Sequence, residues 1–291
     1  MCTMGMLCKK EVDEPVHAVM AKTVDTFPTA MFFGKLRTGQ GGGAIAFSMK
    51  WQQGVNAGLN GAGLAVMSSY LGRTSRLESG KRKSTAGTLD TRGLANGLAL
   101  DRCATVEQAV AEMADYLELH PSSVSGVHFL LDRNGTMGII EHDGGDIAFR
   151  IAVAKRVLIE VRANDSRLLD GTEETEQDDG DDPGLSDDRV LAGTLPHRDR
   201  RLRAKRFRAG LAACGGDRLS SLKRLLGSHQ SDDEGQIGRI CVHDFDHQGA
   251  RGVSPELHST AIALILDPVR GRMLYSDGPP CGGRWRSLFL R

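Results

Sequence analysis

The sequence has no excess of charge of either sign, because Lys and Arg together number 37 and Asp and Glu together also number 37. A chain without net charge exerts no global attraction on nucleic acid or on a membrane surface, so neither is expected as a partner. No apolar run approaches the roughly 18 residues that a membrane-spanning helix needs. The first residues also lack a basic stretch followed by an apolar one, and we therefore expect no signal peptide.

The sequence also lacks any CxxC pair. Its six cysteines are scattered along the chain, at Cys2, Cys8, Cys103, Cys214, Cys241 and Cys281. Scattered cysteines are typical of reduced thiols in the cytoplasm and do not suggest a disulfide framework or a zinc site. The expected location is therefore the cytoplasm.

Several common types of catalytic or binding site are missing as well. The glycines of residues 39–43 (GQGGG) are not followed by Gly-Lys-Ser/Thr, so they do not form a phosphate-binding loop. No GxSxG elbow is present, which leaves a serine hydrolase without its nucleophile. His243 and His247 are spaced four apart, but no predicted helix would place them on one face, so no metal is expected. No cofactor is expected either.

The pattern of apolar residues indicates short strands grouped with a few helices. The expected strands cover residues 16–21, 31–35, 44–49, 64–70, 127–131, 137–141, 147–153, 157–161, 237–242, 260–266 and 272–275. The expected helices cover residues 91–99, 105–117, 200–213 and 219–226. Strands and helices that come in separate blocks predict an α+β fold of antiparallel sheets layered with helices rather than an alternating βαβ fold.

Two neighbouring segments have opposite charge. Residues 170–188 hold ten acidic side chains and no basic one. So little apolar surface cannot order a segment, and we expect a single domain over residues 1–291 with a solvated, flexible insertion at about residues 170–190. Residues 198–208 hold seven basic side chains against one acidic. A non-catalytic binding protein that uses this basic segment to contact acidic partners is therefore one functional hypothesis. Nucleic acid is disfavoured, because aromatic residues are not interleaved with the charges.

The second hypothesis starts from Cys2, which directly follows the initiator methionine. If Met1 is removed, as is usual before a small residue, Cys2 carries both a thiol and a free α-amine. The amine titrates near about pH 8 and the thiol near about 8.5, so the amine can accept the thiol proton close to neutrality. An N-terminal amine is an established activator of a covalent nucleophile. The dipeptide alone does not distinguish this role from that of an ordinary thiol.

A thiol nucleophile of this kind needs three further groups. They are a carboxylate to hold the amine, a cation to favour the thiolate, and donors for a tetrahedral oxyanion. In the segment VMAKTVDTF, Lys22 and Asp25 stand three residues apart near the end of a predicted strand. They are candidates for the cation and the carboxylate, although the same pattern suits surface charges at a strand end.

Motifs in a fixed order resemble those of the choloylglycine hydrolase and penicillin V acylase family. They are the opening MCT, the AKTVD step, AGLNGAGLAVMSSY, the hairpin FLLDRNGTMGIIEH and the strand VLIEVRANDSRLL. The segment STAIALILDPVRGRMLYSDGPPCGG resembles the closing hairpin of the wider acyltransferase-like relatives. The resemblance implies an N-terminal nucleophile (Ntn) hydrolase, a four-layer αββα sandwich with two antiparallel sheets. It also implies a small-molecule amide substrate and a homo-oligomer, either a dimer or a tetramer.

The resemblance assigns a role to each matching residue. Cys2 becomes the nucleophile with its own α-amine as the base, and Asp25 fixes that amine. Lys22 stands where the family usually has arginine, so the charge remains but bidentate contacts are lost. Two oxyanion donors are implied: the backbone N–H of Tyr70 and the side chain of Asn164.

Arg239 is the best match for a late arginine of the site. These roles imply an amidase in which Cys2 attacks a linear, non-peptide amide and forms a thioester that water hydrolyses. An acyltransferase, in which a second amine replaces water, is the alternative within the same chemistry. The chain departs from the family at Thr23, where asparagine is usual, and at the residues 60–63 turn, Asn-Gly-Ala-Gly in place of Asn-Glu-Lys-Gly. Neither bile salts nor penicillins can be inferred as substrates.

Overall fold

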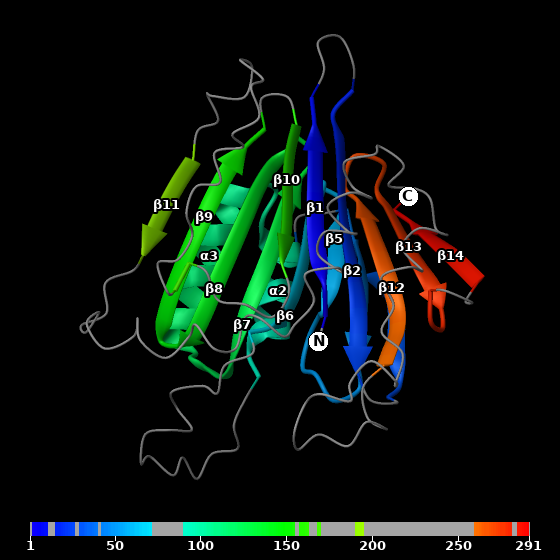
Figure 1. The fold of residues 1–291 in the computed structure, drawn as a ribbon, viewed down its shortest axis with the longest axis horizontal. Coiled ribbons are helices and arrows are strands. Elements are labelled where there is room, and N and C mark those ends of the chain that lie inside the picture. The colour runs from blue at the N-terminus through cyan, green and yellow to red at the C-terminus, as the bar shows by residue number, and fades with distance from the viewer. Residues whose placement is uncertain are drawn as a thin grey trace, which may run out of the picture.

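The computed structural model describes two antiparallel β-sheets that pack face to face (Figure 1). The described residues are 2–10, 15–26, 29–39, 42–71, 90–154, 157–162, 168–169, 190–194, 259–280 and 284–290. Two sheets with helices packed on one of them form an α+β sandwich, as the order of the predicted elements indicates.

The first sheet has six strands in the order β10-β1-β2-β12-β13-β14. Their bounds are Val157–Arg162, Met4–Lys9, His17–Thr26, Ser259–Asp267, Arg272–Asp277 and Arg284–Phe289. The chain therefore begins in the middle of this sheet, because β1 pairs with β10 on one side and with β2 on the other. This position draws the first residues of the chain into the interior.

The second sheet has eight strands in the order β11-β9-β8-β7-β6-β5-β4-β3. Their bounds are Val190–Thr194, Asp146–Val153, Thr136–Gly144, Ser122–Asp132, Leu64–Tyr70, Ala57–Asn60, Ala44–Met49 and Met31–Leu36. From β3 to β9 the strands follow one another in sequence as a meander. Short connections join most of these antiparallel strands, whereas the segment between β6 and β7 contains both of the described helices.

Helices α2 (Arg92–Arg102) and α3 (Val106–Leu119) cover the outer face of the eight-stranded sheet. Alternate side chains of the strands feed two separate cores. One core lies between the sheets and includes Met20, Phe47 and Phe129. The other lies between the eight-stranded sheet and the helices and includes Leu64 and Leu130. The strand period of two thus gives the eight-stranded sheet two apolar faces.

The structure confirms the predicted helix start at Thr105, whose hydroxyl accepts a hydrogen bond from the Gln108 N–H at 3.3 Å. It also shows strands β1 and β5, which the sequence pattern did not predict. The predicted helices 200–213 and 219–226, the predicted strand 237–242 and the acidic segment 170–188 lie outside the described residues. The helix layer that would complete a four-layer sandwich therefore stays a prediction.

Candidate active site

Strands β1 and β2 fix the position of Cys2. The two strands pair from Met4 opposite Lys22 onward. One step before, Thr3 donates its N–H to the Thr23 hydroxyl at 3.1 Å and accepts the Thr23 N–H at 2.9 Å. Cys2 comes directly before Thr3 in the chain, and its Sγ lies 4.0 Å from the Asp25 carbonyl oxygen. Thr23 thus anchors the residue next to Cys2.

Lys22 lies in the interior between the sheets. Its neighbours at strand spacing, Met20 and Val24, belong to the core there, and Lys22 itself is only 1% exposed. Its ammonium reaches across to the eight-stranded sheet, where it donates to Asn56 Oδ1 at 2.6 Å and to the Ser68 carbonyl. An ammonium has three N–H groups, and these two acceptors account for two of them.

Burial lowers the pKa of Lys22 to about 8, because a charged amine loses its hydration in the interior. The charge of Arg92 lowers the pKa of Lys22 further, whereas Cys2 and Asp25 act to raise it. Cys2, Arg92 and Asp25 therefore all lie within electrostatic range of the Lys22 amine. The sequence assigned Lys22 and Asp25 to one site, and the geometry brings both to Cys2.

Asp25 is 7% exposed at the end of β2. Its Oδ1 accepts a hydrogen bond from the Thr260 hydroxyl of β12 at 2.6 Å. The hydroxyl thus fixes the orientation of the Asp25 carboxylate. The backbone carbonyl of Asp25 lies next to the Cys2 thiol, as described above.

Tyr70 ends β6, and its ring contacts two side chains. The ring stacks on Trp51, with ring centres 5.9 Å apart and planes inclined by 18°. The ring also contacts Arg92, whose Cζ lies 3.5 Å from the ring centre. Burial raises the pKa of the Tyr70 hydroxyl, so the phenol stays neutral at ordinary pH. The ring is thus held by its neighbours.

The sequence analysis missed Arg92. This first residue of α2 is 1% exposed, yet it carries a guanidinium. Nε and Nη2 bind the two Asp90 oxygens at 2.9 and 2.6 Å. Burial acts to raise the pKa of Asp90, but its hydrogen bonds and ion pair with Arg92 outweigh burial and lower that pKa. A signal was present, because Arg92 and Asn96 are polar residues spaced four apart on a helix whose other buried residues are small or apolar.

Asn96 ties together the groups that receive the Lys22 ammonium. Its Nδ2 donates to the Val55 carbonyl at 2.8 Å, to the Asn56 carbonyl at 3.2 Å and to Ser68 Oγ at 2.9 Å. Its Oδ1 lies 2.7 Å from His128 Nδ1, which must therefore carry the proton. Both acceptors of Lys22 belong to residues that this one amide holds in place.

His128 and His142 lie side by side on the same face, with ring centres 5.2 Å apart. Burial, together with the charge of Arg92, lowers the pKa of His142 to about 3, although Asp90 opposes the shift. Burial also lowers the pKa of His128 far below its ordinary value, and His142 and Arg92 add to this effect. Both imidazoles are therefore neutral at ordinary pH, and neither supplies charge to the site.

Asn164 and Arg239, the remaining predicted site residues, lie outside the described residues, as do the basic segment 198–208, His243 and His247. Among the residues that the structure describes, no three His, Cys, Asp or Glu side chains come together as ligands for a metal ion. Nor does any helix within the described ranges have the length and apolar character to cross a membrane.

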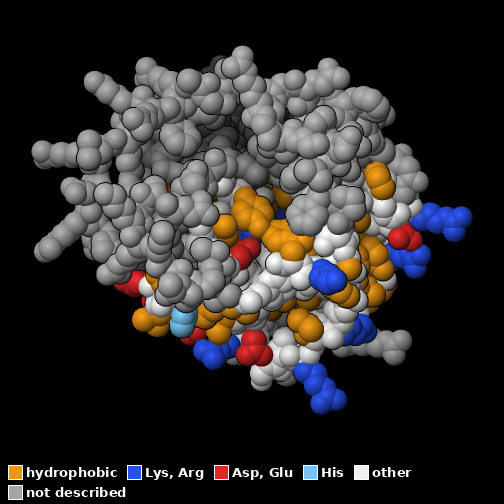
Figure 2. All heavy atoms as spheres, turned by 90° about the horizontal axis from the view of Figure 1, so that it is seen from below, with side chains coloured by type: hydrophobic (Ala, Val, Ile, Leu, Met, Phe, Trp, Pro, Cys, Tyr) orange, Lys and Arg blue, Asp and Glu red, His pale blue; other side chains and the backbone are white. Residues whose placement is uncertain are grey.

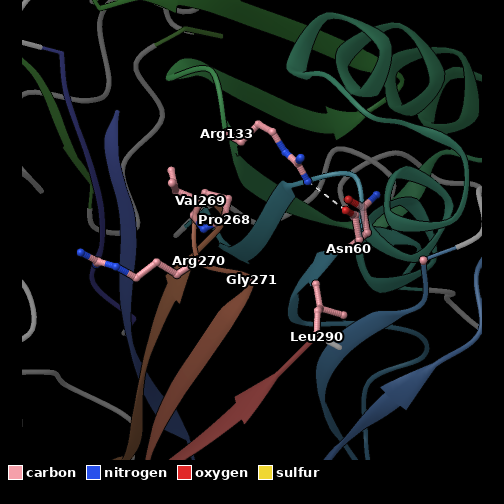
Figure 3. Close-up of a pocket in the computed structure, with 9 residues that line it drawn as sticks. Asn60, Arg133, Pro268, Val269, Arg270, Gly271 and Leu290 are labelled. Carbon is pink, nitrogen blue, oxygen red and sulfur yellow. Dashed lines mark hydrogen bonds between the residues drawn. The ribbon is translucent and has the colours of Figure 1, made fainter. Parts of the chain in front are cut away.

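Seen from below, apolar side chains gather near the middle of this face, next to an acidic one (Figure 2). A separate cavity of about 300 Å³ lies elsewhere, at the turns that join β5 to β6, β7 to β8 and β12 to β13 (Figure 3). Its two cations are already engaged: Arg133 donates to the Gly61 carbonyl at 2.9 Å, and Arg270 binds Asp267 at 2.9 Å. Because β6 separates this cavity from Tyr70 by its full length, the cavity is not part of the Cys2 site.

Comparison with known proteins shows a likeness of fold. No protein-family model and no curated protein sequence matches the chain. Among solved structures, penicillin V acylase from Agrobacterium tumefaciens is 15% identical with a TM-score of 0.51, over 98% of this chain and 86% of that one. A mutant conjugated bile acid hydrolase from Clostridium perfringens is 12% identical with a TM-score of 0.49, over 100% and 97%.

The Caenorhabditis elegans ortholog of N-acylethanolamine-hydrolyzing acid amidase is 11% identical with a TM-score of 0.44, over 99% of this chain and 100% of that one. At such low identity, the match to the penicillin V acylase establishes the class of fold, the Ntn-hydrolase type of sandwich. The particular activity has to be argued from the site.

Proposed function

We propose that this chain is an amidohydrolase whose nucleophile is the thiol of Cys2 after removal of Met1. The observation that carries the proposal is the convergence of Cys2 with a buried ammonium, Lys22, and a buried carboxylate, Asp25, at adjoining strand ends. Burial of a lysine is costly, and a cluster of this kind beside a thiol is typical of a functional site. The likeness of fold to a penicillin V acylase supports the same chemistry.

The proposed reaction begins when the α-amine of Cys2 accepts the thiol proton. The Lys22 ammonium stabilises the thiolate, because a nearby cation lowers the free energy of the charged form. Asp25 holds the resulting α-ammonium, its own position being fixed by the Thr260 hydroxyl. Each of these groups acts on one proton or one charge, so none requires a cofactor.

The thiolate then attacks the carbonyl carbon of a linear amide. The oxyanion that forms accepts hydrogen bonds from the Tyr70 N–H and from Asn164, and Arg239 adds positive charge to the site. When the C–N bond breaks, the α-ammonium returns its proton to the leaving amine. Water next attacks the thioester, gives a proton to the α-amine and releases the acid, which restores the thiol.

A panel of acyl amides tests this proposal, with the wild type compared with Cys2→Ala. Cys103→Ala is the matched control, because it removes a buried thiol at the end of α2. We expect hydrolysis by the wild type and the control and none by Cys2→Ala. Equal cleavage by Cys2→Ala would place the nucleophile elsewhere. An added amine in the same assay separates the two reactions, since an acyltransferase forms a new amide where a hydrolase forms the acid.

A further inference from the structure

The ring of Tyr70 is held between two partners, Trp51, which packs against the core between the sheets, and Arg92, the first residue of α2. Trp51 stacks on it with ring centres 5.9 Å apart, and the guanidinium carbon of Arg92 lies 3.5 Å from its centre. A desolvated guanidinium over an aromatic ring is attracted to the electron-rich face of the ring. Asp90 fixes the plane of the guanidinium through two hydrogen bonds of 2.9 and 2.6 Å. Asp90 therefore helps to set the orientation of the guanidinium over the Tyr70 ring.

The surrounding backbone leaves a defined space for this guanidinium. Gly126 pairs with Tyr70 across the β6–β7 ladder. A Cβ atom on Gly126 would lie 2.4 Å from Arg92 Cδ and 2.4 Å from His142 Nε2. The side chain of Arg92 thus occupies the place that a side chain on the strand opposite Tyr70 would fill.

The energetics do not explain Arg92 as a stabilising residue alone. Replacing a buried ion pair by apolar groups of similar size is often neutral or stabilising. Arg92 is 1% exposed and its partner Asp90 retains 18% exposure, so the pair carries a desolvation cost on the arginine side. A planar guanidinium can stack on an aromatic ring and hold that ring in one position, which is a role beyond stability.

We propose that Arg92 is a positioning residue that fixes the end of β6, so that the Tyr70 N–H is held in place for the oxyanion. The inference rests on the proposed function. On the opposite side, the Lys22 ammonium binds the Ser68 carbonyl two residues earlier in β6. The strand end beside Cys2 is therefore clamped from both faces, by Lys22 from between the sheets and by Arg92 from the helix layer.

Two reactions of Cys2 separate this role from a general effect. Alkylation by iodoacetamide requires the thiolate but forms no oxyanion, because the sulfur attacks a CH₂ carbon and iodide leaves. Amide hydrolysis requires both. Loss of one oxyanion donor typically costs about 10²–10³ in kcat, and a displaced donor should cost less. For Arg92→Met we expect amide kcat to fall about tenfold or more. The rate of alkylation, measured at a pH high enough to ionise the Cys2 thiol fully with or without the Arg92 charge, should change less than about twofold.

The control is Arg102→Met, which removes an arginine from the same helix that is 61% exposed and should leave both rates unchanged. Gly126→Ala is the second variant, since it displaces the Arg92 side chain without removing any charge, and we expect the same selective fall in kcat. If Arg92→Met and Gly126→Ala lower alkylation as much as hydrolysis, or lower neither, the inference is wrong.

Fluorescence provides a readout that does not depend on turnover. The chain has 2 tryptophans, so Trp285→Phe leaves Trp51 as the reporter of the stack. In that background, Arg92→Met should raise the acrylamide quenching constant of Trp51 at least twofold, because the Tyr70 ring is released. Unchanged quenching would refute the positioning role even in an active enzyme. Absence of amide turnover in the wild type would instead refute the proposed function and leave the quenching result to decide on Arg92.

Discussion

The buried ammonium of Lys22 should make stability and activity respond to alkaline pH in opposite directions. Its pKa falls from 10.5 to about 8 on folding, a shift that corresponds to a cost of about 3 kcal/mol for the charged form. Above the folded pKa, the native protein has lost this proton while the unfolded chain still binds it. Stability therefore rises with pH between about 8 and 10.5.

The magnitude follows from the two pKa values. Between about pH 7 and pH 9.5, the native state should gain about 2 kcal/mol from Lys22. Activity should fall over the same interval, to about a tenth at one pH unit above the folded pKa, because only the ammonium stabilises the thiolate. A gain in stability that accompanies a loss of activity is not expected from general alkaline denaturation.

Urea unfolding and amide hydrolysis, each measured from pH 7 to pH 9.5, test this prediction. Lys22→Met is the reference for stability, because methionine fills a similar volume and does not titrate. Lys22→Arg is the reference for activity, since arginine stays charged throughout this range. Wild type and Lys22→Met with the same pH dependence of stability would show that Lys22 has an ordinary pKa. An alkaline loss of activity that persists in Lys22→Arg would show that another group causes it.

Three further predictions concern the groups around this site. Asn96→Ala leaves several buried acceptors without their donor, so it should lower the free energy of unfolding in a urea titration by about 2–3 kcal/mol. An unchanged free energy of unfolding would show that Asn96 is not structurally important. His142 has a pKa of about 3 in the folded state, so acidification from about pH 6.5 to 4.5 should lower the free energy of unfolding of the wild type by about 2 kcal/mol more than that of His142→Asn. Equal acid sensitivity of the two proteins in urea titrations would contradict this. Thr260→Val removes the hydroxyl that binds Asp25 and should reduce kcat/KM about tenfold with no more than about 1 kcal/mol lost in stability, and unchanged kinetics would exclude a role for this contact.

Much of the fold follows from local patterns. The period-two apolar residues of β2 place Lys22 with Met20 and Val24 in the interior, and the capping residues of α3 mark its start. The α+β class follows from the order of such segments. These features are predictable because each depends on residues close together in sequence.

Strand β5 was not predictable in this way. Its residues, Ala57–Asn60, include a glycine and no β-branched residue, which is typical of a turn. The structure explains the glycine, because a Cβ on Gly58 would lie 2.7 Å from the Ile45 carbonyl oxygen and 2.7 Å from Leu100 Cδ1. Close packing of a helix and a neighbouring strand, which depends on distant residues, thus overrides the local preference.

The site was predicted in part for the same reason. Cys2, Lys22 and Asp25 belong to adjacent strands, so their spacing carries a signal. Arg92 joins the site through its contact with Tyr70, 22 positions earlier in the sequence, and through its charge, which acts on Lys22. Nothing in the local pattern around Arg92 indicates that partner, because the contact arises when α2 packs on the sheet.

The central claim is that Cys2, freed of Met1, carries the acyl group during turnover. Intact-mass measurement of the protein, quenched with acid during hydrolysis of an amide, tests it most directly. The account predicts a chain without Met1 that bears one acyl group on Cys2, lost on treatment with hydroxylamine and absent from Cys2→Ala. An active protein that retains Met1, or an acyl group that persists in Cys2→Ala, would contradict it.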